Sequence, residues 1–119
     1  MGASNMAVGV DGIIGSFYNV IPDLYLKIWK AVKDNNIVEA VRLQRQAVHV
    51  IMLGVKSGSM MACIKAWLRA AGVPAGYARR PFNNFEGEEE KRVVEKLLAI
   101  DEADSTGLDI AKRIRGNMK

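Results

Sequence analysis

The hydrophobic residues recur with a helical period along most of the chain, and a different pattern stands only near its start. From residue 22 onward, apolar residues return every three or four positions, the spacing of one face of an α-helix. Polar, glycine or proline residues interrupt this period at 34–36, 57–59, 72–86 and 101–107. The pattern predicts helices over residues 22–33, 37–55, 60–71 and 87–100, and a short amphipathic helix that carries Leu108, Ala111 and Ile114.

Local signals mark several of the predicted helix ends. Pro22 fits the first turn of a helix, where its missing N–H does no harm. Asn36 followed by Glu39 has the spacing of a capping box. Gly72 is placed to end the helix that begins near residue 60, because glycine tolerates the left-handed backbone found just after a helix.

The segment 10–14 reads differently, because it is apolar and β-branched apart from Asp11 and Gly12. That composition favours a strand buried on both faces. A parallel strand flanked by helices normally belongs to a multistranded sheet, and no second strand pattern of comparable quality follows. The alternative is an irregular arm lying on a helical bundle, and the pattern leaves both interpretations open.

The composition is typical of a single globular domain. The 119 residues suffice for one domain, and half of them are apolar and a quarter charged, as in globular proteins. The net charge of +4 is spread along the chain, so we expect no nucleic-acid partner. No apolar run reaches about 18 residues, so we expect no membrane partner either. The single cysteine, Cys63, permits neither an intramolecular disulfide nor a cysteine-based zinc site, and it fits a reducing, cytoplasmic location.

The polar side chains suggest no catalytic arrangement of their own. His49 is the only histidine, so we expect a packing or surface role. Lys65 lies between apolar residues on a predicted helix, and we expect it to be solvated. Arg79 and Arg80 can clamp a carboxylate or tie the extended segment to helix ends, and the second role is favoured. We expect two tyrosines, Tyr18 and Tyr77, to anchor loops on the core.

Three stretches together resemble a known family. They are "GVDGIIGSFYNV" at residues 9–20, "NNIVEAVRLQRQ" at 35–46 and "IKAWLRAAGVPAGYARRPF" at 64–82. Their order and spacing are similar to the end of the N-acetylneuraminate lyase and dihydrodipicolinate synthase family, and the form Gly-Ser-x-Tyr-Asn at 15–19 is closer to its neuraminate lyase branch.

The resemblance implies a fold class for the chain. It would be mainly α, comprising the last strand (10–14) and C-terminal helical bundle of a truncated (β/α)8 TIM barrel. Residues 1–100 would form the C-terminal third of such a class I aldolase, and the other strands would lie upstream in a longer chain. The tail 101–119 matches nothing in the family.

The resemblance also implies a function for the parent enzyme. It would cleave a carbon–carbon bond of a sugar acid to give pyruvate, through a lysine Schiff base and with no cofactor. Its partners would be the sugar-acid or 2-oxo acid substrate and other copies of itself. The catalytic lysine and tyrosine belong to strands that this chain lacks, so we expect the chain alone to be inactive.

The residues expected at the substrate are Ser16, Gly15 and Ile14, at the C-terminal end of the last strand. Taken without the resemblance, the pair Gly15–Ser16 reads as a plain turn. Phe17 stands where the family commonly has threonine, which leaves the substrate open. The alternative function is a stand-alone helical interaction or oligomerisation module without catalysis.

Overall fold

A computed structural model describes residues 5, 8–9, 12, 15–80 and 83–118. Within these residues the chain forms a single 3-10 turn, five α-helices and no strand. The elements in order are η1 (Ser16–Asn19), α2 (Pro22–Lys33), α3 (Ile37–Lys56), α4 (Met60–Ala70), α5 (Glu88–Asp104) and α6 (Asp109–Asn117). Of the strand predicted over 10–14, only Gly12 is described, so that strand lies outside the described residues and stays a prediction.

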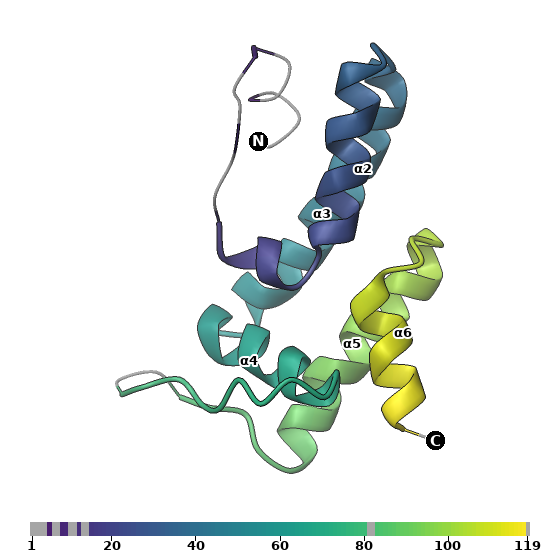
Figure 1. Ribbon diagram of the computed structural model, residues 1–119. Helices are drawn as coiled ribbons and strands as arrows, with labels where there is room; N and C mark the ends of the chain where they lie inside the picture. Colours follow the sequence, from purple (N-terminus) through teal and green to yellow (C-terminus); the bar gives the residue numbers. More distant parts are fainter. Residues whose placement is uncertain (1–4, 6–7, 10–11, 13–14, 81–82, 119) are drawn as a thin grey trace.

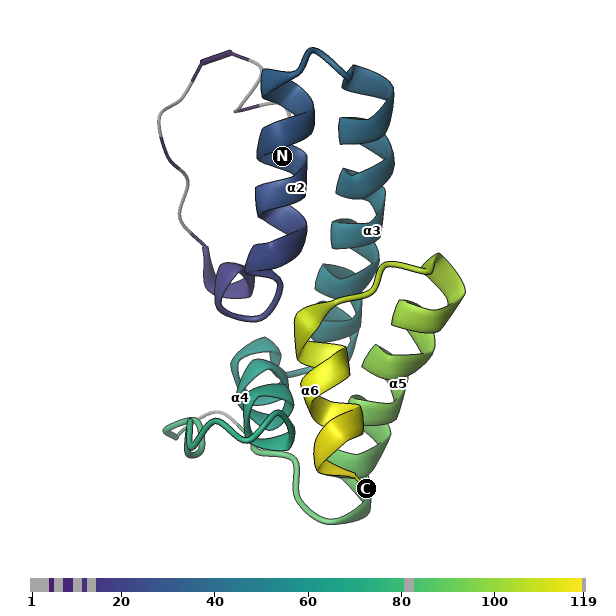
Figure 2. The ribbon, with the colours of Figure 1, turned by 45° about the vertical axis from the view of Figure 1, so that its right-hand side comes forward.

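Two helical hairpins and one crossing helix make up the arrangement. Helices α2 and α3 run side by side in opposite directions, and α5 and α6 form a second pair beside the lower half of α3 (Figures 1 and 2). The chain bends by 112° between α3 and α4, at residues 57–59. Helix α4 therefore crosses the lower end of the molecule and contacts α3, α5 and α6.

The helix ends follow the local signals in the sequence. Pro22 opens α2. The Asn36 side chain accepts a hydrogen bond of 3.3 Å from the backbone N–H of Glu39 at the start of α3, as the capping-box spacing predicts. Gly72 has a φ of 91° just beyond α4, and the next backbone N–H, that of Val73, donates to the carbonyl of Leu68 at 2.9 Å.

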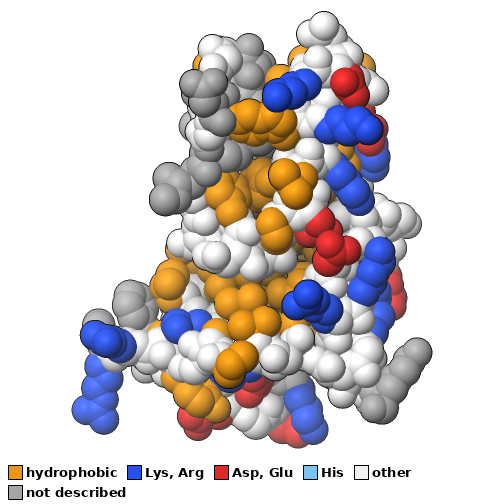
Figure 3. Space-filling model, in the orientation of Figure 1, with side chains coloured by type: hydrophobic (Ala, Val, Ile, Leu, Met, Phe, Trp, Pro, Cys, Tyr) orange, Lys and Arg blue, Asp and Glu red, His pale blue; other side chains and the backbone are white. Residues whose placement is uncertain are grey.

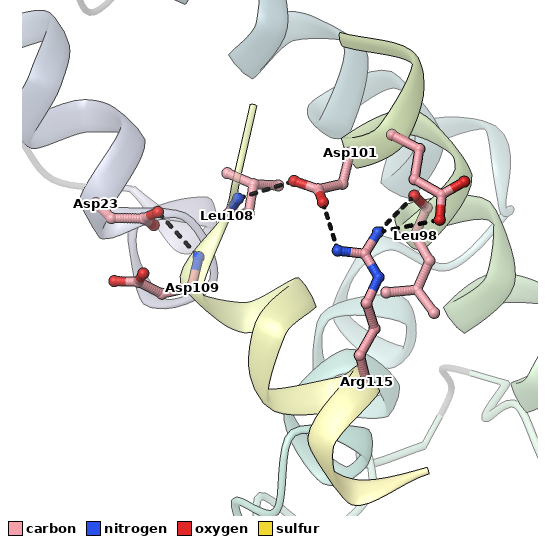
Figure 4. Close-up of polar contacts among 7 residues, drawn as sticks. Asp23, Leu98, Asp101, Leu108, Asp109 and Arg115 are labelled. Atoms are coloured by element: carbon pink, nitrogen blue, oxygen red, sulfur yellow. Dashed lines mark hydrogen bonds and ion pairs between the residues drawn. The ribbon is translucent and has the colours of Figure 1, made fainter. Parts of the chain in front are cut away.

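Helix α5 is longer than the sequence pattern predicts. We expected it to end at Ile100 and residues 101–107 to form a loop, but it continues to Asp104 and ends at Ser105, which has a left-handed backbone. The polar residue that resembles the start of a loop, Asp101, is only 4% exposed. Its carboxylate accepts from the backbone N–H of Leu108 at 2.8 Å and from Nη1 of Arg115 at 2.9 Å (Figure 4). The helix continues because these donors satisfy the buried acid.

One hydrophobic core joins all five helices. Trp67 of α4 is fully buried near its centre, and its indole N–H donates to the carbonyl of Val93 at 2.8 Å. The tail supplies part of this core through Leu108, which precedes α6, and through Ala111 and Ile114 on the buried side of that helix. The described part of the tail, residues 101–118, therefore belongs to the same folded unit as the helices before it.

No single helix in the described ranges is both long and apolar enough to cross a membrane. Only α3 and α4 taken together have the length and apolar composition of such a helix, and the chain bends by 112° between them.

Candidate functional site

The segment 15–19 forms a short turn at the foot of α2. The backbone N–H of Tyr18 donates to the carbonyl of Gly15 at 3.3 Å, and the side-chain amide of Asn19 donates to the carbonyl of Ser16 at 3.2 Å. Gly15 is extended and exposed, and Ser16 is exposed where η1 begins. The turn thus holds its backbone through local hydrogen bonds and presents Ser16 on the surface.

Phe17 fastens this turn to the helices beneath it. Its ring is 7% exposed, and its centroid lies 6.5 Å from that of Trp67. The ring also lies against Gly54 of α3, so closely that a Cβ placed on this glycine would come within 2.7 Å of Cζ of Phe17. Because no side chain fits between the ring and α3, Gly54 allows the turn to approach the helix.

A second aromatic contact holds the turn from the α2 side. The rings of Tyr18 and Tyr25 meet edge to face, with centroids 4.2 Å apart. Burial, helped by the neighbouring Tyr18, raises the pKa of Tyr25 to about 12, and a side-chain hydrogen bond with Gln44 of α3 opposes the rise. Tyr25 therefore stays protonated at neutral pH and serves the packing of the turn.

A cleft of about 440 Å3 lies beside this turn. Hydrophobic side chains gather in the middle of the face that carries η1 and α4 (Figure 3). The cleft is lined by residues of η1, α2, α4 and α6 and the loops beside them, namely Asn19, Val20, Pro22, Asp23, Leu68, Ala71, Val73, Asp109, Ile110, Lys112 and Arg113. At its edge the Asp23 carboxylate accepts from the backbone N–H of Asp109 at 3.0 Å, which ties α2 to the start of α6 (Figure 4).

The structure places two of the three residues expected at a substrate. Gly15 and Ser16 lie together at the exposed start of the turn. Ile14 lies outside the described residues. The substrate-binding roles of all three stay predictions.

The other polar candidates have structural partners. Nδ1 of His49 lies 2.7 Å from a carboxylate oxygen of Asp104, so this exposed pair links α3 to the end of α5. The ammonium of Lys65 is half-buried and donates to the carbonyl of Ala75 at 2.9 Å. The expectation that Lys65 is solvated was therefore only half right, since it holds the extended segment against α4.

Arg69 ties down the extended segment, a role that sequence reasoning gave to Arg79 and Arg80. Its guanidinium donates to Oε1 of Glu90 at 3.2 Å and to the carbonyl of Gly76 at 2.5 Å, and it lies 4.0 Å from the centroid of the Tyr77 ring. The side chains of Arg79 and Arg80 are exposed and make no hydrogen bond or ion pair with another described residue. The signal for Arg69 was its place in the last turn of a helix followed by the acidic run at 86–90.

Metal binding finds no support in the described ranges, where no three histidine, cysteine or acidic residues come together in a way that could hold an ion. The acidic run at 86–90 instead supplies the first turn of α5, where Glu88 pairs with Lys91 at 3.4 Å.

Comparison with curated proteins finds relatives among lyases. The chain is 39% identical over 83 residues to the N-acetylneuraminate lyase of Rhizobium meliloti, an alignment that covers 70% of this chain and 27% of that protein. It is 31% identical over 94 residues to the N-acetylneuraminate lyase of Actinobacillus pleuropneumoniae, covering 79% of this chain and 32% of the relative. An uncharacterized DapA-like lyase of Pyrococcus horikoshii is 26% identical over 95 residues, which cover 80% of this chain and 33% of that protein.

The alignments also fix how much of the relatives the chain represents. It spans only about a quarter to a third of the length of the curated relatives that it matches. No solved structure matches it. Residues 1–100 match the dihydrodipicolinate synthetase family, and the chain belongs to that family.

Proposed function

We propose that this chain is the C-terminal part of an N-acetylneuraminate lyase-like aldolase, in which Ser16 contacts a sugar-acid substrate. The observation that carries the proposal is the well-packed turn at 15–19. Its Ser16 lies on the surface, while the rings of Phe17 and Tyr18 pack against Trp67 and Tyr25 and fix the position of the turn. Such a turn gives a hydroxyl a fixed position, which a substrate contact needs.

The parent enzyme would cleave a carbon–carbon bond through a lysine Schiff base, with pyruvate as one product and without a cofactor. That chemistry needs an amine held unprotonated against a carbonyl carbon. The lysine and the tyrosine that the family resemblance implies lie on strands outside this chain. The half-buried lysine here, Lys65, is already engaged with a backbone carbonyl. The chain alone is therefore expected to be inactive.

The cytoplasm is the compartment we infer for the parent enzyme. The single cysteine, Cys63, is buried and free, as suits a reducing environment.

Two matched reactions test the proposal. The chain is first incubated with pyruvate and borohydride, beside the Rhizobium meliloti lyase, and intact masses are measured. We expect an adduct on the lyase and an unchanged mass for this chain. An adduct on Lys65, or on any other lysine of this chain, would show that the piece carries its own nucleophile.

The role of Ser16 is tested in a chimera in which the whole of this chain, including the core residues of its tail, replaces the matching end of the Rhizobium lyase. We expect Ser16→Ala to lower kcat/KM by about five- to tenfold, the cost of one hydrogen bond to substrate. The matched control is Ser59→Ala, because the buried hydroxyl of Ser59 has no hydrogen-bond partner in the described structure. Equal activities of the two variants would exclude Ser16 from the site.

The second candidate function, an interaction or oligomerisation module, is favoured by one observation on α3. Its outward side carries apolar residues separated by three, seven, four and three positions, and their side chains are between 40% and 83% exposed: Val38, Val41, Val48, Met52 and Val55. Such a stripe is typical of a helix that packs on another chain. Sedimentation velocity over a wide concentration range distinguishes the two functions, because a strictly monomeric chain that binds no hydrophobic dye would remove the support for this one.

A further inference from the structure

The lower end of α3 meets α4 and α5 (Figure 2). Side chains of these three helices and of the bend between α3 and α4 line a separate groove. Its volume is about 360 Å3, within the range of about 300–1,000 Å3 typical of small-molecule sites. The lining is mostly apolar and includes Leu53, Cys63, Trp67, Val93 and Ile100. It shares no residue with the turn at 15–19 or with the cleft beside that turn.

Two lysines flank the groove. Lys56 stands at the end of α3 and Lys96 on α5, and both side chains are exposed. Neither forms an ion pair with any of the carboxylates that the structure describes, whereas Arg42, Arg69, Lys91 and Arg115 of α3–α6 do. The groove therefore combines an apolar floor with two ammonium groups that have no acidic partner.

We propose that this groove binds a small amphipathic carboxylate, with its hydrocarbon part against Leu53 and Ile100 and its carboxylate beside Lys56 and Lys96. Burial of the hydrocarbon part supplies the affinity. The two lysines select the charge of the head group, since opposite charge attracts most strongly beside an apolar surface. The proposal does not depend on the function proposed for the turn.

The groove does not repel an anion from its floor. Among the residues that the structure places on this floor, only Cys63 carries an ionisable group, and burial raises the pKa of its thiol to about 11, so it is neutral at pH 7.

The probe ligands are sodium octanoate and octan-1-ol, which share a chain length and differ in charge. The chain contains two tryptophans, so Trp29→Phe leaves Trp67 as the only source of indole fluorescence. We expect octanoate to change that fluorescence saturably and to bind about fivefold more tightly than octan-1-ol. Two partly exposed ion pairs account for a difference of that size.

Two variants test the groove at its mouth and floor. We expect the double variant Lys56→Gln/Lys96→Gln to weaken octanoate about fivefold and leave octan-1-ol unchanged. Ala99→Phe, at an exposed position in the lining, should weaken both ligands by filling the groove. The matched control is Lys27→Gln/Lys30→Gln on α2, which removes two lysines from another face and should change neither affinity.

Three results would overturn the proposal. One is octanoate binding that survives the double variant, and another is octan-1-ol binding as tightly as octanoate. The third is a fluorescence change that follows protein concentration in the absence of ligand, with a dimer in sedimentation that octanoate does not dissociate. That outcome would assign the groove to a second copy of the chain.

Discussion

The contact between Gly54 and Phe17 offers the sharpest test of how the turn at 15–19 is held. In an exposed helix position, replacing glycine by alanine stabilises a protein by about 1 kcal/mol, because alanine loses less backbone entropy on folding. At Gly54 the new Cβ would come within 2.7 Å of Cζ and 3.1 Å of Cε1 of the Phe17 ring. Overpacking of that kind costs about 1–3 kcal/mol.

We therefore expect Gly54→Ala to lower the free energy of unfolding by about 1 kcal/mol. Gly116→Ala is the matched control, since Gly116 also lies in a helix, α6, and a Cβ there would meet nothing within 4 Å. This control should be neutral or stabilising by up to about 1 kcal/mol.

Combining the substitution with Phe17→Leu isolates the clash. Leucine lacks the ring atoms that approach Gly54, so in that background Gly54→Ala should stabilise the protein by about 1 kcal/mol. The coupling energy would then be about 2 kcal/mol, within the range measured for side chains in contact. Urea unfolding, followed by circular dichroism and by tryptophan fluorescence, provides the four free energies. A coupling below about 0.5 kcal/mol would refute the close approach of the ring to α3.

Two further substitutions test the tail and the buried thiol. In urea titrations, Asp101→Asn should lower the free energy of unfolding by about 1–3 kcal/mol, because Arg115 loses the buried carboxylate that it contacts. The matched control is Glu102→Gln, at an exposed carboxylate 3.5 Å from the same arginine. It should change the free energy of unfolding by less than about 0.5 kcal/mol. Burial raises the pKa of Cys63 from 9.0 to about 11, so the stability that the neutral thiol contributes is fully present below pH 9 and is lost as the pH rises toward 11. Between these two pH values the free energy of unfolding should fall more for the unsubstituted protein than for the Cys63→Ala variant. Equal losses in the two proteins would contradict the burial of the thiol.

Local signals made most of the helices predictable from the sequence. Asn36 and Gly72 act on backbone groups a few residues away, so their effects can be read without the fold. The end of α5 was not predictable in this way. Asp101 resembles the first residue of a loop, and only the return of Leu108 and Arg115 from the following segment makes its burial favourable.

The candidate site was predictable to a smaller extent. Local pattern identified the pair Gly15–Ser16 as a turn, and its substrate role came from the family resemblance alone. What holds the turn is a contact with Gly54, which lies far along the chain on another helix. No spacing rule connects Phe17 to that glycine, because 36 residues of chain separate the two. Such contacts depend on the tertiary arrangement, which periodicity does not encode.

The match to the family ends at residue 100, and the hydrophobic core does not. Helix α5 runs through that position without a break, and the first residue beyond it, Asp101, is buried. Farther along, Leu108 and Ile114 are almost completely inaccessible to solvent, which requires that α6 covers apolar surface of the preceding helices. A tail merely appended to a finished domain would carry its apolar residues on an exposed face. Here the tail completes the core, so residues 101–118 must be retained in any experiment on the turn or on the groove.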